Sequence, residues 1–316
     1  MKILAKLAGK RRGADDFIFD SLNIIFMLLL CVVMLYPMVN TLAVSLNDAT
    51  DTVRGGIYFW PREFTWYNFE HVFSQSQLLH AGMISVLRTV IGTAISVFCT
   101  AMVAYTISRK QFVLKKFVTI AFVLTMYLNG GLIPTYLLMR ELSLIGTFWI
   151  YIIPGLIGVF NLIVIRSFIE GLPETIFESA KIDGAGEFTQ FFKIALPLCL
   201  PVIATVSLFV AVGQWNSWFD VFIYNSNKPE LSTLQYELMK ILQNSNASMS
   251  SGSAASAFAS SQSGVVETVT PQSVRAAMTI IVSVPIICVY PFLQKYFVKG
   301  LTLGGVSIIL CKYPCF

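Results

Sequence analysis

Charged residues are rare along much of the chain, and the segments between them form six long apolar runs. The runs cover residues 21–47, 89–108, 117–139, 142–165, 194–219 and 276–294. Each run is long enough for a helix to cross about 30 Å of hydrocarbon, which takes roughly 20 residues. None alternates with a period of two residues, as a membrane-spanning β-strand would. The pattern therefore predicts an all-α membrane protein with six transmembrane helices.

Composition supports a chain solvated by lipid. Of its 316 residues 56% are hydrophobic and 12% charged, whereas soluble domains carry roughly 25% charged residues. The net charge of +5 is mild, and the basic residues flank the apolar runs instead of forming a stripe. We therefore expect no nucleic-acid partner. The six cysteines lie in apolar runs or near the C-terminus, so neither a disulfide framework nor a metal site is expected.

The distribution of Lys and Arg predicts the orientation. The loops on one side of the six runs carry few of the 22 basic residues, namely Arg54, Arg62, Arg140, Lys228 and Lys240. Arg88 and Arg275 lie at span edges, and all the others fall on the opposite side. Cytoplasmic loops are enriched in Lys and Arg. We therefore expect a multi-pass protein of the cell membrane with both termini in the cytoplasm.

This topology divides the chain into a cytoplasmic N-terminal segment (1–20), a six-helix membrane domain (21–300) and a cytoplasmic tail (301–316). Two outer loops are long. The first contains the aromatic stretch GGIYFWPREFTWYNF, which could form an interfacial helix or pack on the bundle. The second, 225–273, includes a Ser-, Ala-, Asn- and Gly-rich part and is expected to be flexible. It is either a solvated connector or a contact with an extracytoplasmic partner.

The cytoplasmic loop 172–197 is polar, although it joins two apolar runs. Its central part continues to residue 201 as ESAKIDGAGEFTQFFKIALPLCLP from Glu178. Pro173 suits the start of a helix, and Asp183-Gly184 should end that helix because glycine adopts positive φ at low cost. An amphipathic helix lying on an anionic membrane would favour Lys and Arg. Glu174, Glu178, Asp183 and Glu187 instead favour docking to a basic protein surface.

This segment resembles the EAA loop of ABC importer permeases. The residues at the matching positions are Glu178, Ala180, Asp183, Gly184, Ala185, Phe191, Leu196, Pro197 and Pro201, with Ser179 replacing the first alanine. The resemblance implies that the loop is a coupling helix that docks in an ATPase subunit. NGGLIPTYLL, GQWNSWFD and YPFLQKYFVKGLTLG are similar to carbohydrate-uptake permeases, in particular those of Gram-positive oligosaccharide importers. Residues 306–316 extend beyond the usual end of such permeases.

The resemblance also implies partners and cargo: a second, homologous permease, two ATP-binding cassette subunits, an extracytoplasmic solute-binding protein and a sugar or oligosaccharide. The chain has no phosphate-binding loop of the G-x-x-x-x-G-K-[ST] type and no catalytic constellation. We therefore expect a non-catalytic subunit with no cofactor of its own, ATP and Mg²⁺ residing in the ATPase subunits. The alternative is an ion-coupled secondary carrier or channel, but buried acids of an ion relay are not evident in the runs.

The fifth run with the residue that follows it, and the middle of the third run, supply candidates for a sugar path. Aromatic faces can cover a sugar ring and polar groups can bind its hydroxyls, and the candidates are Asn129, Gly131, Gln214, Trp215, Asn216, Trp218 and Asp220. Alternatives stay open for several of them. The tryptophans also suit an interfacial aromatic belt, Asp220 could reach water at a span end, and Gly131 could serve helix packing. For Arg88 we expect contact with headgroups or with a polar neighbour.

Overall fold

The computed structural model describes residues 14–128, 130–250 and 270–289, and its regular elements are helices apart from one isolated β-bridge between Asn47 and Phe64. The chain separates into two compact units. One consists of Met1–Val72 and Ser253–Ile280, and the other of Phe73–Gly252 and Ile281–Phe316. The tail 301–316 lies outside the described residues, as does Asn129.

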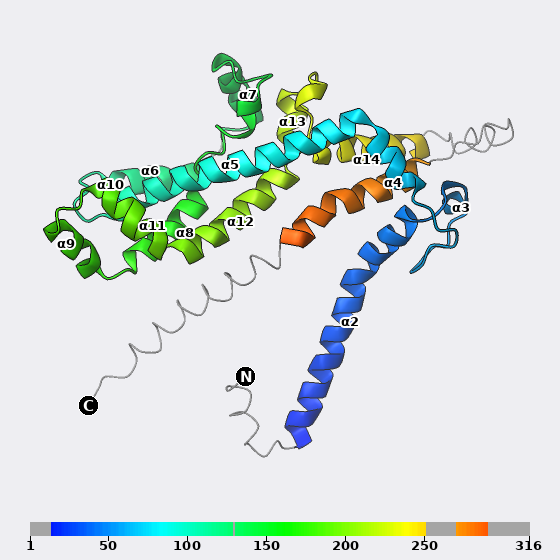
Figure 1. The fold of residues 1–316 in the computed structure, drawn as a ribbon, viewed down its shortest axis with the longest axis horizontal. Helices are drawn as coiled ribbons and strands as arrows, with labels where there is room; N and C mark the ends of the chain where they lie inside the picture. Colours follow the sequence, from blue (N-terminus) through cyan, green and yellow to red (C-terminus); the bar gives the residue numbers. More distant parts are fainter. Residues whose placement is uncertain (1–13, 129, 251–269, 290–316) are drawn as a thin grey trace. The chain divides into compact units, whose positions relative to one another are not determined.

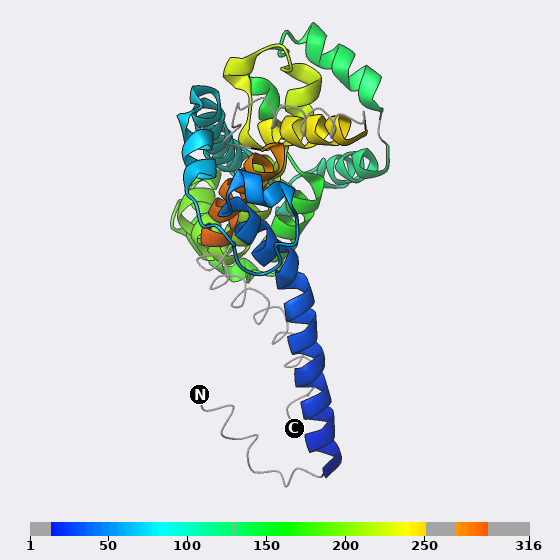
Figure 2. The same cartoon turned by 90° about the vertical axis from the view of Figure 1, so that its right-hand side faces the viewer.

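The first unit is dominated by one long helix, α2 (Ala14–Ser45), which the two ribbon views show as continuous (Figures 1 and 2). Its apolar side chains are exposed along most of its length, as expected for a helix surrounded by lipid. The short helix α3 (Ala49–Val53) follows. Asp48 caps α3 by accepting from the amide and hydroxyl of Thr50, and these bonds lower the pKa of the Asp48 carboxyl. Helix α4 (Tyr67–Ser74) comes after an irregular loop.

The second unit is built around α5 (Ser76–Ser108), which packs against α8 (Val159–Glu170) and α12 (Leu200–Asn216) (Figure 1). Small residues of α5, such as Ala101 and Ala104, are fully buried in this contact and let the helices approach closely. A second apolar cluster surrounds Ile150, Tyr151 and Val221. The remaining elements of the unit are α6 (Lys115–Tyr127), α7 (Leu132–Glu141), η1 (Phe148–Tyr151), α9 (Glu174–Ile182), α10 (Glu187–Gln190), η2 (Phe191–Ala195), α11 (Leu196–Leu198), α13 (Phe219–Tyr224), η3 (Pro229–Leu231) and α14 (Leu234–Ser250).

The third and fourth predicted spans are not single helices. The third run is split between α6 and α7, and Gly131 has φ +87° at the start of α7, which agrees with the expected break around its glycines and proline. The fourth run is not one helix either. Its first part contains only the 3₁₀ turn η1, and regular α-helix begins at Val159. Apolar composition predicted a single membrane-spanning helix here, but hydropathy carries no information on backbone breaks.

The fifth run is bent by 80° between Glu187–Leu198 and Leu200–Asn216. Pro197 and Pro201 lie on either side of the break at Cys199, and each removes a backbone donor from the helical ladder. Among the described residues, three helices are long and apolar enough to cross a membrane, Ile18–Ser45, Ser76–Ser108 and Pro271–Val289. The bent pair adds a fourth if it is counted as one span.

The second outer loop contains more structure than its composition predicted. Helix α14 occupies Leu234–Ser250 within the segment 225–273 that we expected to be flexible. Thr233, Tyr236 and Leu238 are buried, so the start of this helix packs on the second unit. The Ser- and Ala-rich part at 251–263 lies outside the described residues.

Candidate functional site

The polar segment 172–197 folds as a helix, a tight turn and a second helical stretch. Helix α9 begins after Pro173 and ends at Ile182, and Gly184 then adopts φ +78°. The Gly184 amide donates to the Lys181 carbonyl (3.0 Å) and the Ala185 amide to the Ala180 carbonyl (2.9 Å). These two bonds form a Schellman motif, which requires the left-handed conformation at its glycine. The predicted role of Gly184 in the turn is thus supported by its backbone geometry.

One face of α9 is anchored to the end of α5. Phe177 is buried against the Tyr105 ring, with centroids 6.4 Å apart. The Arg109 guanidinium lies over the Phe177 ring at 4.4 Å and over the Tyr105 ring at 5.3 Å. Such cation–π contacts favour a fixed position for the arginine. The buried face of α9 is therefore attached to α5 by the stacked side chains of Tyr105, Phe177 and Arg109.

Polar bonds connect the same arginine to the second helical stretch. Arg109 donates to the Gln190 Oε1 atom (3.0 Å), and the Gln190 side-chain Nε2 donates to the Ala185 carbonyl in the turn (2.8 Å). Gln190 is fully buried. Tyr105 donates its hydroxyl proton to Glu187 (2.9 Å), which also lies 3.7 Å from Arg109. Arg109 therefore fixes α9, the turn and α10 as one body at the end of α5.

The opposite face of α9 and the turn is exposed. It presents Glu178, Ser179 and Asp183 beside the apolar side chain of Ile182, which is 86% exposed. Glu174 and Glu187 pair with the chain's own lysines and arginine, and the hydrogen bond from Lys110 to Glu174 raises the pKa of Lys110. Within the described ranges, Glu178 and Asp183 make no ion pair. Two carboxylates next to an apolar side chain are suited to a basic, partly apolar protein surface.

The predicted docking residues thus divide into two groups. Glu178, Ser179, Asp183 and Gly184 are exposed and available to a partner. The others contribute to the loop itself: Ala180 and Phe191 are buried, Ala185 closes the turn, and Leu196 and the exposed Pro197 belong to α11 at the entry to the fifth run.

In the fifth run, Gln214 and Asp220 converge on a buried arginine of α5. Arg88 donates from Nε to the Gln214 Oε1 atom (2.8 Å) and from Nη1 to Asp220 Oδ1 (3.1 Å), and a further bond joins its Nη2 to Asp220 Oδ2. Only 3% of the Arg88 side chain and 22% of the Asp220 side chain are exposed. The partly exposed Asp220 carboxylate thus forms a bidentate pair with Arg88, a partner that the sequence did not identify.

Neighbouring polar groups complete this cluster. The Arg88 guanidinium lies 4.6 Å from the centroid of the Tyr151 ring. The Tyr151 hydroxyl donates to the Leu231 carbonyl (2.7 Å) and accepts from the Asn225 side chain (2.7 Å). A Cβ at Gly92 would lie 3.2 Å from the Gln214 side chain, so glycine makes room for that glutamine on α5. The cluster ties α5 to the end of α12, to η1 and to the loop before α14.

The other path candidates are not gathered at this cluster. Trp215 donates its indole proton to the Val282 carbonyl on the helix Pro271–Val289 (3.0 Å). Trp218 packs beside Phe219 and Phe222. Asn216 is exposed, and Gly131 begins α7, a helix that meets α13 through the stacked rings of Tyr136 and Tyr224. Asn129 lies outside the described residues.

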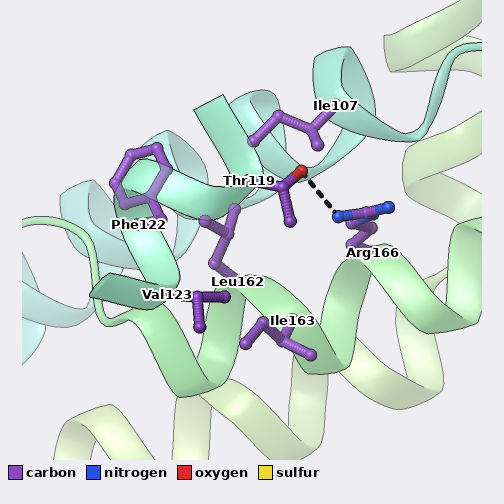
Figure 3. Close-up of a pocket in the computed structure, with 7 residues that line it drawn as sticks. All are labelled: Ile107, Thr119, Phe122, Val123, Leu162, Ile163 and Arg166. Carbon is purple, nitrogen blue, oxygen red and sulfur yellow. Dashed lines mark hydrogen bonds between the residues drawn. The ribbon is translucent and has the colours of Figure 1, made fainter. Parts of the chain in front are cut away.

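A small hollow between α5, α6 and α8 offers no such polar groups (Figure 3). It is lined by Ile107, Thr119, Phe122, Val123, Leu162, Ile163 and Arg166. Arg166 donates to the Thr119 hydroxyl (2.8 Å) and pairs with Glu170. A sugar site needs several polar partners for hydroxyl groups, whereas both polar residues here already bond each other. The hollow is therefore a packing gap between three helices.

Sequence reasoning missed the residues that hold both regions together. Arg109 and Arg88 were seen only as charges near span ends, and Gln190 and Tyr105 were not singled out. One signal was available: Gln190 is a polar residue in a stretch where Phe188, Phe191 and Phe192 surround it. A lone polar side chain in such a stretch usually has a specific partner when it is buried.

Comparison with known proteins gives the family. Residues 3–303 match the model of the binding-protein-dependent transport system inner membrane component. The permease protein YtcP of a Bacillus subtilis polygalacturonan/rhamnogalacturonan transport system is 33% identical over 295 residues, covering 92% of this chain and 98% of YtcP. Protein LplC of the same organism is 34% identical over 291 residues, covering 92% and 95%.

A solved structure gives the same fold. A chain of a bacterial ABC transporter involved in import of the acidic polysaccharide alginate superposes with a TM-score of 0.80 at 23% identity, covering 91% of this chain and 99% of that one. The family model spans nearly the whole chain, and the fold agrees with it. The chain therefore belongs to the binding-protein-dependent transport system inner membrane components, the non-catalytic permease subunits of ABC importers.

Proposed function

We propose that this permease translocates a sugar or oligosaccharide that an extracytoplasmic solute-binding protein delivers. Its membrane domain (21–300) has six transmembrane helices, both termini lie in the cytoplasm, and the loop 172–197 faces the cytoplasm. A second, homologous permease completes the path, and two ATPase subunits bind ATP and Mg²⁺. The abundance of Lys and Arg in the loops assigned to the cytoplasm supports this orientation.

The proposal that this loop is the coupling helix rests on the exposed face of α9. Glu178 and Asp183 are exposed there without an internal ion pair, whereas the neighbouring acids Glu174 and Glu187 are paired within the chain. A motion imposed on α9 reaches α5 directly, because Arg109 stacks on Phe177 and bonds Gln190. Transport requires that ATP and the cargo favour different arrangements of the paired permeases. A ligand that binds both arrangements with equal affinity does not change their populations.

The names of the relatives support a carbohydrate cargo. YtcP is described for polygalacturonan/rhamnogalacturonan, and two further relatives for arabinooligosaccharides and galactooligosaccharides. We infer an oligosaccharide for this chain on that basis. For the path we propose Asn216, which is exposed, together with the aromatic side chains of Trp215 and Trp218 in the same segment. Gln214 and Asp220, the other polar candidates of this segment, bond Arg88.

An ion-coupled carrier is the competing function, and the partly buried Asp220 is the observation that favours it. An acid inside a membrane protein is a candidate for an ion relay. Here the carboxylate is bonded to Arg88 through both oxygens, so it already has a fixed counter-charge. We therefore assign the Arg88–Asp220 pair a structural role.

Replacing Glu178 by Gln should weaken association with the ATPase subunit tenfold or more. The expected loss corresponds to one charge-assisted hydrogen bond, about 1.5–3 kcal/mol. The measurement is the affinity of the purified permease pair for the ATPase subunits, together with ATP-dependent uptake in proteoliposomes. Uptake should also require ATP and persist when ion gradients are collapsed.

Glu174→Gln is the matched control. It removes a carboxylate from the same helix, but that carboxylate pairs with Lys110 of the same chain on an exposed surface. Exposed pairs contribute little, about 0–1 kcal/mol. The ATPase affinity of this variant should stay within threefold of the wild type. Equal effects of the two substitutions, or uptake driven by an ion gradient without ATP, would contradict the proposal.

A further inference from the structure

The loop after α2 folds back along the helix that it leaves. Asn40, on α2, donates both amide protons to loop carbonyls, to Ile57 (2.7 Å) and to Tyr58 (3.0 Å). One turn earlier on the same face of α2, the Tyr36 ring meets the Phe59 ring edge-on at 5.3 Å. The loop tip is therefore bound beside α2 well before the helix ends at Ser45.

The base of the loop is fixed by buried polar bonds. Asn47 is fully buried, and its Oδ1 atom accepts from the amides of Arg62 (2.8 Å) and Glu63 (3.0 Å). Arg62 in turn donates to the Asp51 carboxylate (2.9 Å). The Thr65 amide donates to the Leu46 carbonyl (2.9 Å), which closes the base across the two chain segments. The tip thus has a defined position relative to α2.

The tip exposes three aromatic side chains in succession. Ile57 is buried with Ala43 and Val44 of α2, whereas Tyr58, Phe59 and Trp60 are exposed, Trp60 to 82%. The segment between Arg54 and Arg62 contains no charged residue. Because the base fixes the loop, these aromatic side chains stay exposed at the tip, which is unfavourable in water. The surface continues the apolar, exposed side of α2, which faces lipid.

The length of α2 places this tip at the edge of the hydrocarbon. The apolar stretch Ile18–Ser45 has 28 residues, about 42 Å of helix, which exceeds a hydrocarbon core of about 30 Å. Asn23 is the last polar residue near the start of this stretch. A hydrocarbon core that begins there ends roughly 20 residues later, close to Ala43. Tyr36 then lies about 10 Å below this boundary and Asn40 about 5 Å below it.

We propose that Tyr58, Phe59 and Trp60 form an aromatic anchor that inserts into the headgroup boundary of the outer leaflet beside α2. Tyr and Trp are suited to this level because their rings are amphipathic. Asn40 makes the insertion possible, since loop carbonyls at this depth need an internal donor. The anchor fixes the depth and rotation of α2 in the bilayer. Its assignment to the outer leaflet rests on the proposed orientation, whereas its depth does not.

Brominated phospholipids measure that depth. The assembled importer is placed in nanodiscs with bromine high on the acyl chains or near their ends, and the Trp60 signal is the difference between wild type and Trp60→Phe. We expect bromine high on the chains to quench this signal at least twofold more than bromine near the ends. A Trp60 signal that neither lipid quenches would overturn the proposal, whether the residue then proved to face water, the second permease or the solute-binding protein.

Asn40→Leu tests the connection to α2, and Thr41→Val is its matched control. Thr41 bonds only the Pro37 carbonyl of its own helix, whereas Asn40 holds the loop. Quenching of Trp60 should fall at least twofold in Asn40→Leu and stay unchanged in Thr41→Val; equal quenching in both would overturn the role of Asn40. Iodide added outside sealed vesicles tests the leaflet separately. Quenching by internal iodide alone would refute the orientation while leaving the measured depth intact.

Discussion

Gly184→Pro is expected to abolish ATP-dependent uptake while leaving the permease in the membrane. Proline fixes φ near −65° and has no amide proton, whereas Gly184 has φ +78° and donates to the Lys181 carbonyl. Both bonds of the turn between α9 and α10 depend on this conformation. The change should misdirect the exposed face with Glu178 and Asp183. Uptake and stimulation of the ATPase by the solute-binding protein are the measurements.

Two further glycine variants make this result specific. A Cβ at Gly184 would meet nothing within 4 Å, so Gly184→Ala has only a conformational cost, about 1–2 kcal/mol in the left-handed region. It should reduce uptake roughly tenfold, which corresponds to about 1.4 kcal/mol. Gly186 has φ −68° and equally open surroundings, so Gly186→Ala should transport normally. Wild-type uptake by Gly184→Pro, or equal loss in Gly186→Ala, would show that the turn is not used for coupling.

The features that follow from local chemistry could be predicted from the sequence. Hydropathy located the apolar runs, and the pair Asp183-Gly184 located the turn, because φ above zero is a property that glycine supplies by itself. The break in the third run also followed from its glycines and proline. The 3₁₀ turn before α8 could not be predicted, since an apolar run is compatible with helix and with an irregular buried segment.

Contacts between distant residues could not be predicted from one sequence. Arg88 and Asp220 are 132 positions apart, and Arg109 and Gln190 are 81 apart. From the sequence, Arg88 and Asp220 each looked like a solitary charged residue at the edge of a run, for which water or headgroups are adequate partners. In the fold, Asp220 follows α12, which packs on α5, and Gln190 ends α10 beside Arg109. The candidate docking face was therefore predictable, whereas the bonds that hold it and the polar cluster required the fold.

Asp220→Asn is expected to destabilise the permease severely, by about 3–5 kcal/mol, because it leaves the Arg88 charge buried without a partner. Arg88 is the more buried member of the pair. Arg88→Met should cost less, since the partly exposed Asp220 carboxylate can be hydrated. The measurement is unfolding in detergent, followed by uptake for the variants that still assemble.

The double variant Arg88→Met with Asp220→Asn separates the ion pair from the packing around it. With neither charge present, it should regain more than half of the stability lost in Asp220→Asn, since removing both partners of a buried pair is often close to neutral. The exposed pair Lys110–Glu174 gives the contrast, because Glu174→Gln should change stability by less than about 1 kcal/mol. A stable Asp220→Asn permease whose uptake loses its dependence on pH would instead identify Asp220 as a proton carrier. Recovery in the double variant would establish that Asp220 is present to neutralise Arg88, where α5 meets the end of α12.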